Sequence, residues 1–368
     1  MSAPVLEIRG LHKRFSAEHW VIDDLSLTVG EGELLCVLGA SGCGKTTMLR
    51  LICGFEVPDR GEIVHQGQLI ARPGWGVRPE RRRIGMVFQD YALFPHMTVR
   101  ANVRFGLEPP LRQRIAGWFG RHAAGAYSSA AAEQRVAQLM EMTGLSRYAE
   151  RYPHELSGGQ LQRIALARAL APGASLMLLD EPFSNLDANL RSRLRLEVHD
   201  VLKQAGVTAI LVTHDQEEAL NLADRIAVMN RGRIEQIGPP EEILHQPRTR
   251  FVARFTGMSD LLPGRVEGGQ IVTDMGCFPM PAGLALGLGE RVEILMRPNY
   301  LHVAAEGDGV PARIERIDYL GVQRVYTLVL ATGTRFRAVL PGQLERREED
   351  MVRVRFQPPH LSVFPMEY

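Results

Sequence analysis

Cysteine is scarce in this sequence, and the cysteines present lack the spacing of a metal site. The chain of 368 residues contains four of them. Cys36, Cys43 and Cys53 lie in or beside one glycine-rich segment, where a disulfide would distort the backbone, so a reducing cytoplasm is favoured. Long apolar runs are also missing, since none approaches the roughly 18 residues of a membrane-spanning helix. Residues 1–10 do not resemble a secretion leader, and we expect that the chain neither crosses a membrane nor is exported.

An excess of charge of either sign is absent as well. The 43 basic and 42 acidic residues leave a formal net charge of +1, whereas binding to the phosphates of nucleic acid depends on concentrated positive charge. No nucleic-acid partner is therefore expected. With 45% hydrophobic residues and a length beyond one typical core, the composition is that of two soluble globular domains.

The strongest motif is a glycine-rich loop between an expected strand and an expected helix. Residues 34–38 form an apolar run typical of a buried strand, and the periodicity of residues 47–53 predicts a helix. Glycines let successive N–H groups face phosphates, while Lys45 and Thr46 supply an ammonium group and a Mg²⁺ ligand. We expect a nucleoside triphosphate to bind here. The expected contacts are Gly39, Ala40, Ser41, Gly42, Cys43, Gly44, Lys45, Thr46 and Thr47.

A second anion site is expected where Ser157, Gly158 and Gly159 precede a helix over residues 160–170. This arrangement puts a hydroxyl group and accessible N–H groups at a helix N-terminus. A simple helix cap is the alternative, although a cap requires a serine and not two consecutive glycines.

Two adjacent carboxylates, Asp180 and Glu181, follow directly after the apolar run 176–179. Ligands of open α/β sheets bind at the carboxyl ends of buried strands, so this position favours metal and water chemistry. Asp180 is expected to hold Mg²⁺, directly or through water. Glu181 is expected to polarise the water that attacks the γ-phosphorus and to accept its proton. A solvated acidic turn is the alternative, which the apolar run disfavours.

Two more polar residues stand at strand ends. His214 follows the apolar run 209–213, and Gln89 follows the run 86–88. A lone histidine at a strand end is more often structural, and only its position relative to the other motifs marks His214 as functional. The Gln89 amide can bind Mg²⁺ or position a water. Asp187 can cap a helix over residues 188–198.

Short apolar runs alternate with helical segments over residues 5–257, which predicts a largely parallel α/β core. From about residue 91 strand signals give way to helical periodicity, most clearly over 132–142, so an inserted helical subdomain is expected. A last helix over 241–245 precedes residues 251–256, which are expected to run along the surface toward a boundary near 257–263. The segment 111–132 has no assigned role.

Beyond this boundary, short alternating runs with Gly and Pro turns replace the helical pattern. We therefore expect residues 258–368 to form a small antiparallel β-barrel. Its clearest strands are expected at residues 292–296, 324–329, 335–339 and 352–356.

In their order along the chain, these motifs resemble those of the ABC ATPase family. The resemblance spans about residues 5–257. It implies an α/β P-loop ATPase core with an inserted helical subdomain at about residues 91–160, which binds and hydrolyses ATP with Mg²⁺. The resemblance is carried by the phosphate loop, Gln89, residues 156–160, Asp180 with Glu181, residues 184–187 and His214.

The resemblance also implies roles for the site residues. Two copies of the chain form a head-to-tail homodimer around two ATP molecules. Gln89 senses the nucleotide and joins Thr46 and Asp180 as a Mg²⁺ ligand, His214 touches the γ-phosphate, and Asp187 shapes the dimer interface. The residues that reach across to the γ-phosphate of the other copy are Ser157, Gly158, Gly159 and Gln160.

Adenine in this family is usually held by an aromatic ring upstream of the phosphate loop. Phe15 is the best match and Trp20 the second, because stacking needs only a π face. Either ring could instead belong to the core.

With one nucleotide-binding domain and no membrane span, the resemblance implies an import ATPase at the cytoplasmic face of the inner (cell) membrane. Its partners would be integral-membrane permease subunits, with a solute-binding protein acting indirectly. Residues 89–97 correspond to the segment that receives the permease, or alternatively form an apolar patch that closes the helical subdomain.

The C-terminal part resembles the OB-like domains of import ATPases for ferric ion, polyamines, sulfate and sugars, with the ferric-ion group closest. That choice rests on residues 39–44, 180–191, 212–220 and 256–264. Ferric-ion import is the expected function and polyamine import the alternative. A soluble ABC protein of repair, chromosome structure or translation is disfavoured, because the chain has neither a long coiled-coil insertion nor a second nucleotide-binding domain. A third interpretation makes the barrel a sensor of solute or of a regulator.

Overall fold

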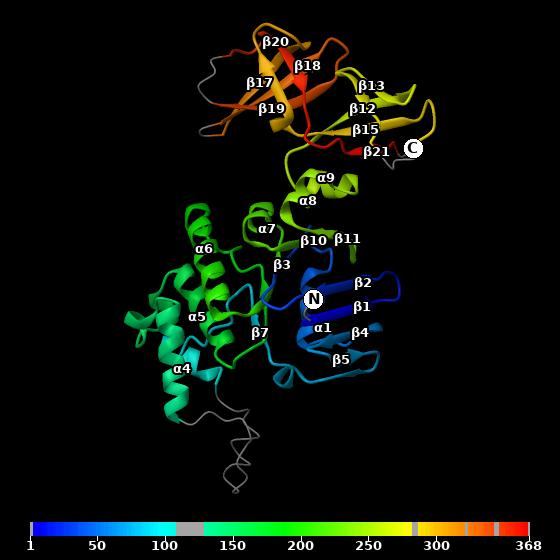
Figure 1. Ribbon diagram of the computed structural model, residues 1–368. Coiled ribbons are helices and arrows are strands. Elements are labelled where there is room, and N and C mark those ends of the chain that lie inside the picture. Colours follow the sequence, from blue (N-terminus) through cyan, green and yellow to red (C-terminus); the bar gives the residue numbers. More distant parts are fainter. Residues whose placement is uncertain (1–2, 108–128, 282–285, 321–322, 342–345, 367–368) are drawn as a thin grey trace. The chain divides into compact units, whose positions relative to one another are not determined.

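The computed structural model describes residues 3–107, 129–281, 286–320, 323–341 and 346–366. The chain divides into two compact units, Met1–Pro240 and Glu241–Tyr368 (Figure 1). The second unit begins earlier than the boundary near residue 257 that the sequence predicts. It includes Ala253, because this residue packs with Leu295 and Phe364. Most of the segment 111–132 lies outside the described residues.

A six-stranded sheet forms the centre of the first unit. In order across the sheet its strands are β11 (Arg233–Gly238), β10 (Arg225–Asn230), β3 (Leu34–Gly39), β9 (Thr208–Thr213), β8 (Leu176–Asp180) and β7 (Ile84–Val87). All neighbours pair in parallel except β11 with β10. Strands β3, β8 and β9 are buried along their whole length, so the sequence shows them as uninterrupted apolar runs. The predicted parallel α/β core is confirmed.

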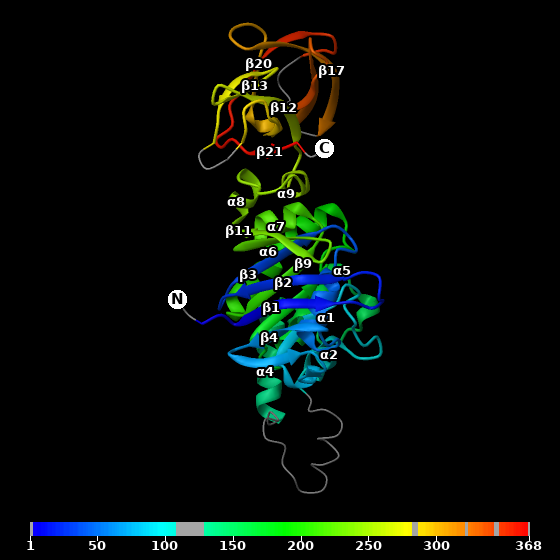
Figure 2. The ribbon, with the colours of Figure 1, turned by 90° about the vertical axis from the view of Figure 1, so that its right-hand side faces the viewer.

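A second, antiparallel sheet shares the hydrophobic core of this unit, and α1 (Lys45–Cys53) contributes to the same core. Figures 1 and 2 show α1 beside the strands of this sheet. Met48, Leu49, Leu51 and Ile52 of α1 are fully buried. A helix that is apolar around most of its circumference needs cover on several sides, and the two sheets provide it. In order the strands of the second sheet are β2 (Ile22–Val29), β1 (Leu6–Lys13), β4 (Arg60–His65), β5 (Gln68–Arg72) and β6 (Trp75–Gly76).

Helices make up most of the rest of the first unit. As the helical periodicity predicts, α2 (Val99–Phe105) and α4 (Ser129–Met142) pack against α5 (Gly158–Leu170). Figure 1 shows α4, α5 and α6 (Ala188–Ala205) together, on the side of the unit away from β1 and β2. A shorter helix, α7 (Gln216–Leu222), follows β9, and one-turn 3-10 helices occur at Pro79–Arg81, Ser146–Tyr148 and Pro153–Glu155. Across the described ranges, no helix has both the length and the apolarity to span a membrane.

The second unit is an antiparallel β domain, as expected for an OB-like fold. Its two sheets share one hydrophobic core, in which Tyr326 and Phe336 are the largest fully buried side chains. One sheet has the order β14 (Gly276–Pro279), β13 (Gln270–Thr273), β12 (Asp260–Glu267), β15 (Arg291–Met296) and β21 (Val363–Pro365). The other has the order β16 (Leu301–Ala304), β20 (Met351–Phe356), β17 (Val310–Leu320), β18 (Gln323–Leu330) and β19 (Arg335–Pro341). A 3-10 turn, Pro298–Tyr300, joins β15 to β16.

Two short helices, α8 (Pro240–His245) and α9 (Arg250–Phe255), precede this β domain. The expectation that residues 251–256 run along the surface is therefore wrong. Thr249 caps α9 by accepting a hydrogen bond from the Val252 N–H group, and Val252 and Ala253 are buried. Burial of this apolar face stabilises the helix. Helical periodicity is difficult to recognise in the sequence when a helix has only six residues.

A buried arginine fixes the carboxyl end of α1. The Arg82 side chain donates hydrogen bonds to the carbonyl groups of Leu51 and Ile52 at 2.8 Å and to that of Val77 at 2.7 Å. The last carbonyl groups of a helix have no partner within the helix, and a cation there also suits the helix dipole. Burial lowers the pKa of the Arg82 guanidinium group from its ordinary value. The helix that carries the phosphate loop at its start is thus held at its end.

We expect Arg82→Met to lower the free energy of unfolding by about 2–4 kcal/mol, because buried carbonyl groups lose their hydrogen-bond partners. Urea unfolding followed by circular dichroism measures the change. Arg81→Met is the matched control, since Arg81 is exposed at the preceding position. Equal unfolding midpoints for the two variants would contradict the role given to Arg82.

Candidate functional site

The carboxyl ends of β3, β9 and β8 lie next to one another, because these strands are parallel neighbours. The phosphate loop follows β3, Glu181 follows β8 and His214 follows β9. Two contacts join these segments. The Thr46 hydroxyl group donates to Asp180 Oδ1 at 3.1 Å, and His214 Nδ1 lies 3.2 Å from Glu181 Oε2. The fold therefore brings together residues that the sequence places far apart.

Close packing requires the glycines of the phosphate loop. A Cβ atom on Gly39 would lie 2.5 Å from the carbonyl oxygen of Met229. Gly44 has a left-handed backbone with φ of 110°, and a Cβ atom there would lie 2.6 Å from the carbonyl oxygen of Val21. Glycine alone lacks a Cβ atom and adopts a positive φ without strain. The loop can therefore follow this backbone path only with glycine at these two positions.

Lys45 begins α1 and points back into the loop. The residue is buried, with 5% of its surface exposed. Its ammonium group donates hydrogen bonds to the carbonyl groups of Gly39 at 2.7 Å and Ala40 at 3.0 Å. Both acceptors are neutral, and a buried charge gains more from an ionised partner than from a neutral one. A phosphate in the loop would supply that partner.

Asp180 and Thr46 present the hard oxygen ligands that Mg²⁺ prefers. Burial raises the pKa of the Asp180 carboxyl above its ordinary value of 3.8, and the neighbouring Glu181 adds to this rise, while the Thr46 hydrogen bond and Lys45 oppose it. A divalent cation would stabilise the ionised carboxylate. The described residues contain no group of three or more His, Cys, Asp or Glu side chains that could hold a metal ion by itself. Mg²⁺ would therefore rely on phosphate and water oxygens for its remaining ligands, as it commonly does.

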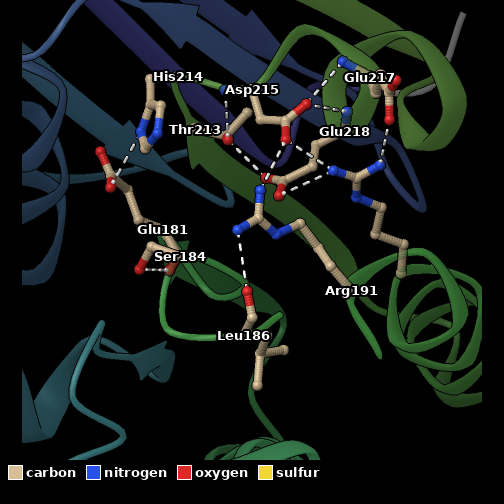
Figure 3. Close-up of polar contacts among 10 residues, drawn as sticks. Glu181, Ser184, Leu186, Arg191, Thr213, His214, Asp215, Glu217 and Glu218 are labelled. Atoms are coloured by element: carbon tan, nitrogen blue, oxygen red, sulfur yellow. Dashed lines mark hydrogen bonds and ion pairs between the residues drawn. The ribbon is translucent and has the colours of Figure 1, made fainter. Parts of the chain in front are cut away.

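Glu181 is turned out of the strand direction by its backbone. Its φ of 45° lies in the left-handed region, which is uncommon for a residue other than glycine. The Glu181 N–H group donates to the Val212 carbonyl at 2.9 Å, and the Ser184 hydroxyl donates to the Glu181 carbonyl at 3.0 Å. Figure 3 shows the resulting carboxylate beside the His214 ring. The side chains of Glu181 and His214 are 19% and 51% exposed, so a bound ligand can reach them.

Gln89 follows β7 and is exposed. The backbone carbonyl group of Gln89 accepts a hydrogen bond from Asn185 Nδ2 at 2.8 Å, and this bond holds the Gln89 backbone against the loop after β8. Tyr91 and Ala92 both have a left-handed backbone, with φ of 63° and 46°. Arg168 of α5 donates to the carbonyl groups of both, at 3.0 and 2.8 Å. Arg168 thus stabilises a strained turn that the sequence alone does not indicate.

Ser157 begins α5 as its N-cap residue, which agrees with the capping alternative. Gln160 Oε1 accepts a hydrogen bond from the Ser157 N–H group at 2.9 Å. Packing accounts for the glycines, because a Cβ atom on Gly159 would lie 2.5 Å from the Leu194 side chain, and one on Gly158 would lie 2.9 Å from Leu186. The two glycines therefore do not by themselves require an anion site. Ser157 is exposed, so its hydroxyl group remains accessible at the start of the helix.

Asp187 caps α6, with its Oδ1 accepting a hydrogen bond from the Leu190 N–H group at 2.9 Å. The capping alternative for this residue is therefore confirmed. Asp187 itself is exposed.

An ion-pair network that the sequence analysis missed lies beside His214 (Figure 3). Asp215 Oδ1 caps α7, while Asp215 Oδ2 pairs with Arg195 at 2.7 Å and with Arg191 at 3.4 Å. Arg191 also donates to the Leu186 carbonyl at 3.0 Å. An Asp followed by acidic residues is a signal for a helix start, so the cap was detectable. Its arginine partners, 20 and 24 residues away, carry no such signal.

Of the two aromatic candidates for adenine, Phe15 has the more open ring, with 61% of the residue exposed. Lys13 Nζ lies 5.4 Å from the ring centroid of Phe15. Trp20 is half-buried, and the guanidinium groups of Arg14 and Arg60 lie over its ring at 4.8 and 5.4 Å. The Trp20 ring is thus already engaged by two cations, which leaves Phe15 as the better platform for stacking.

Comparison with family models gives two matches. The model described as ABC transporter matches residues 22–184, and the model described as TOBE domain matches residues 294–364. These matches agree with the ATPase fold of the first unit and with the antiparallel β fold of the second.

Curated relatives match over most of the chain. The spermidine/putrescine import ATP-binding protein PotA of Pseudomonas fluorescens is 42% identical, covering 92% of this chain and 90% of that protein. The putrescine transport ATP-binding protein PotG of Escherichia coli is 40% identical, covering 94% of this chain and 89% of that protein. The Fe(3+) ions import ATP-binding protein FbpC 2 of Rhodococcus jostii is 44% identical, covering 89% of this chain and 88% of that protein.

Two solved structures resemble the chain. The protein cbiO1 from Clostridium perfringens, part of the ABC transporter complex cbiONQ, has a TM-score of 0.56 and 27% identity, covering 66% of this chain and 91% of that chain. The ATP-binding cassette MJ0796, a dimer bound to ADP and Pi, has a TM-score of 0.51 and 28% identity, covering 64% of this chain and 98% of that chain.

The raised pKa of Asp180 has a consequence for stability. The native state holds this proton more tightly than the unfolded chain, so stability is lost as the pH rises above the ordinary value of 3.8 and the buried carboxyl ionises. We expect nucleotide-free Asp180→Asn, which keeps an oxygen for the Thr46 hydroxyl, to unfold at a higher urea concentration than the native chain at pH 7. This advantage should shrink as the pH is lowered.

Asp200→Asn provides the control for that comparison, since the Asp200 side chain is 80% exposed. Unfolding midpoints measured from pH 7 downward separate the two variants. A destabilised Asp180→Asn at pH 7, or an advantage that does not depend on pH, would contradict the assigned cause.

Proposed function

This chain belongs to the ABC transporter family, as the ATP-binding subunit of an importer, and we propose that the imported solute is a polyamine. The support is similarity, because an ATPase of this kind is not expected to touch the solute. PotA of Pseudomonas fluorescens and PotG of Escherichia coli, both named for polyamine transport, align with 92% and 94% of this chain. The iron-import relative aligns with 89% of it.

Ferric-ion import, which the sequence motifs favour, is the second candidate. One observation supports it, namely that FbpC 2 of Rhodococcus jostii has the higher identity, 44% against 42% and 40% for the two polyamine proteins. The two candidates share one ATPase mechanism and differ only in the permease and binding protein that they would serve.

The contact between Glu181 and His214, beside the Thr46–Asp180 pair, is the observation that carries the proposed mechanism. We propose that the Glu181 carboxylate accepts a hydrogen bond from the attacking water and takes up its proton. His214, 3.2 Å away, would hold that carboxylate in place and face the γ-phosphate. Lys45 would exchange its two carbonyl partners for phosphate oxygens.

Thr46 and Asp180, with Gln89 as a third ligand, are the residues that would hold Mg²⁺. When bound, Mg²⁺ neutralises charge on the phosphate oxygens during phosphoryl transfer. The Asn185 hydrogen bond fixes the backbone of Gln89 and leaves its exposed side chain free to turn toward the phosphate loop. Phe15 would stack on the adenine ring.

A homodimer is the proposed working form. The exposed hydroxyl of Ser157 and the start of α5 would face a nucleotide held by a second copy, which completes each site with Gly158, Gly159 and Gln160. Asp187 is exposed at the start of α6 and would lie at the contact between the copies. The dimeric state of MJ0796 with ADP and Pi supports this arrangement.

Membrane permease subunits are the proposed partners, with the ATPase at the cytoplasmic face of the cell membrane and a binding protein acting indirectly. Residues 5–257 would be the nucleotide-binding domain that hydrolyses ATP, and residues 258–368 would be an accessory domain. The segment 89–97 would receive the permease. The ring centroid of Phe94, in this segment, lies 4.5 Å from that of Phe105 in α2. Phe105 is 42% exposed, and exposed aromatic groups are common at protein interfaces.

We expect Glu181→Gln to lower the rate of ATP hydrolysis by about 100-fold or more, because the general base is lost, while ATP affinity is retained. Lys45→Ala should instead lose ATP affinity. Steady-state hydrolysis and titration with a fluorescent ATP analogue separate these effects. Glu31→Gln, at an exposed position, is the control. Hydrolysis by Glu181→Gln at the native rate would show that another group is the base.

For the solute, we expect ATP-driven uptake of spermidine into vesicles that contain the chain with its permease subunits and binding protein. Fe³⁺, sulfate and maltose are tested in parallel, and the Glu181→Gln variant measures uptake that does not depend on hydrolysis. Uptake of Fe³⁺ without uptake of spermidine would replace the polyamine proposal by the second candidate.

A further inference from the structure

Arg191 lies near the start of α6 and contacts two segments of the site at once. Its backbone N–H group donates to the Asp187 carbonyl, as in a regular helix. Its side chain donates from Nη2 to the Leu186 carbonyl at 3.0 Å, and its Nη1 lies 3.4 Å from Asp215 Oδ2. Figure 3 shows Arg191 between Leu186 and Asp215. One guanidinium group therefore joins the loop after Glu181 to the residue after His214.

Asp215 is held firmly enough to pass a displacement on to His214. Its Oδ1 accepts hydrogen bonds from the N–H groups of Glu217 and Glu218 at 2.8 and 3.2 Å, so its side chain is fixed to the start of α7. Its N–H group donates to the Thr213 hydroxyl at 3.0 Å. A shift of Asp215 would accordingly move the backbone on which the His214 ring is mounted.

Arg195, one turn further along α6, has a different environment. Its side chain is only 7% exposed and pairs with Asp215, Glu217 and Glu218 at 2.7, 3.1 and 3.5 Å. Removing a buried partner of this kind leaves uncompensated charge and destabilises the fold. Both arginines line a hollow of about 410 Å³ together with Asp215 and His214, but the Arg191 side chain is the more exposed of the two, at 29%. Arg195 thus has the position of a structural residue, whereas Arg191 has room to move with the loop that it contacts.

We propose that Arg191 is a positioning residue for hydrolysis, which transmits the position of the Ser184–Asp187 loop through Asp215 to His214 and Glu181. The inference rests on the proposed function, because the loop would be displaced when a second copy of the chain closes on bound ATP. Closure would then set the distance between His214 and Glu181, and hydrolysis would begin only in the closed dimer. This makes Arg191 a link between dimer contact and chemistry, separate from ATP binding itself.

The test uses the full chain with Arg191→Met, Arg191→Lys and Asp215→Asn. Asp215→Asn keeps an oxygen that can cap α7 but presents no negative charge to the arginines. We expect Arg191→Met and Asp215→Asn each to lower kcat on the order of tenfold or more, through misplacement of the His214–Glu181 pair, with KM for ATP changed less than twofold. Arg191→Lys, which retains the charge, should recover part of the loss.

The double variant Arg191→Met/Asp215→Asn identifies the route. If Arg191 acts through Asp215, the double variant should have the same kcat as either single variant rather than the product of the two losses. Arg193→Gln is the matched control on the same helix, since the Arg193 side chain is 82% exposed and pairs with Glu197 of α6; its kcat should be that of the native chain.

Thermal unfolding of every variant separates positioning from loss of fold. A native kcat for Arg191→Met, losses that multiply in the double variant, or a fall in kcat that matches the fraction of unfolded protein would each overturn the proposal. Failure of the proposed function is recognised differently, because either the native chain would not hydrolyse ATP or Glu181→Gln would hydrolyse it at the native rate.

Discussion

The parallel pairing of β3, β9 and β8 is the constraint on which the site depends. In register, Leu38 of β3 stands beside Thr213 of β9, and Val212 stands beside Asp180 of β8. Three strands that are far apart in the sequence therefore end at one edge of the sheet, and each is followed at once by a polar residue or a glycine loop. All three strands are buried along their whole length, which is why the sequence shows them as mainly apolar runs. Displacing one strand by a residue would separate the Thr46 hydroxyl from Asp180 and the His214 ring from Glu181.

The charges at this edge are only partly compensated within one chain. Lys45 donates to neutral carbonyl groups, and Asp180 is buried enough that its pKa is raised. Triphosphate and Mg²⁺ together would satisfy both groups, since the first brings negative charge to the lysine and the second brings positive charge to the carboxylate. Glu181 and His214 remain open to solvent, as does the start of α5. The site is thus arranged to be completed from outside the single chain.

Local pattern predicts the elements of this site well and predicts the contacts between them poorly. The phosphate loop, the apolar strands and the capping role of Asp187 follow from residues that are neighbours in the sequence, and the structure agrees with each. Arg82, Arg168 and Arg191 act on carbonyl groups or carboxylates that are distant in the chain or on another element, which no periodicity reveals. Periodicity does not predict α9, because a helix of six residues spans less than two turns. The glycines after Ser157 predict an anion site, and the structure adds a second reason for small residues there, since a Cβ atom at either position would come close to the Leu186 or Leu194 side chain.

The claim that two copies complete each other's nucleotide site is tested most directly by sedimentation velocity of the full-length Glu181→Gln chain, with and without saturating Mg-ATP. The account predicts a monomer without nucleotide, a dimer with Mg-ATP, and no dimer when Ser157 is also replaced by Arg, because the second copy then lacks its contact to the triphosphate. A chain that stays monomeric with Mg-ATP, or a dimer that forms equally well with Ser157→Arg, would contradict it.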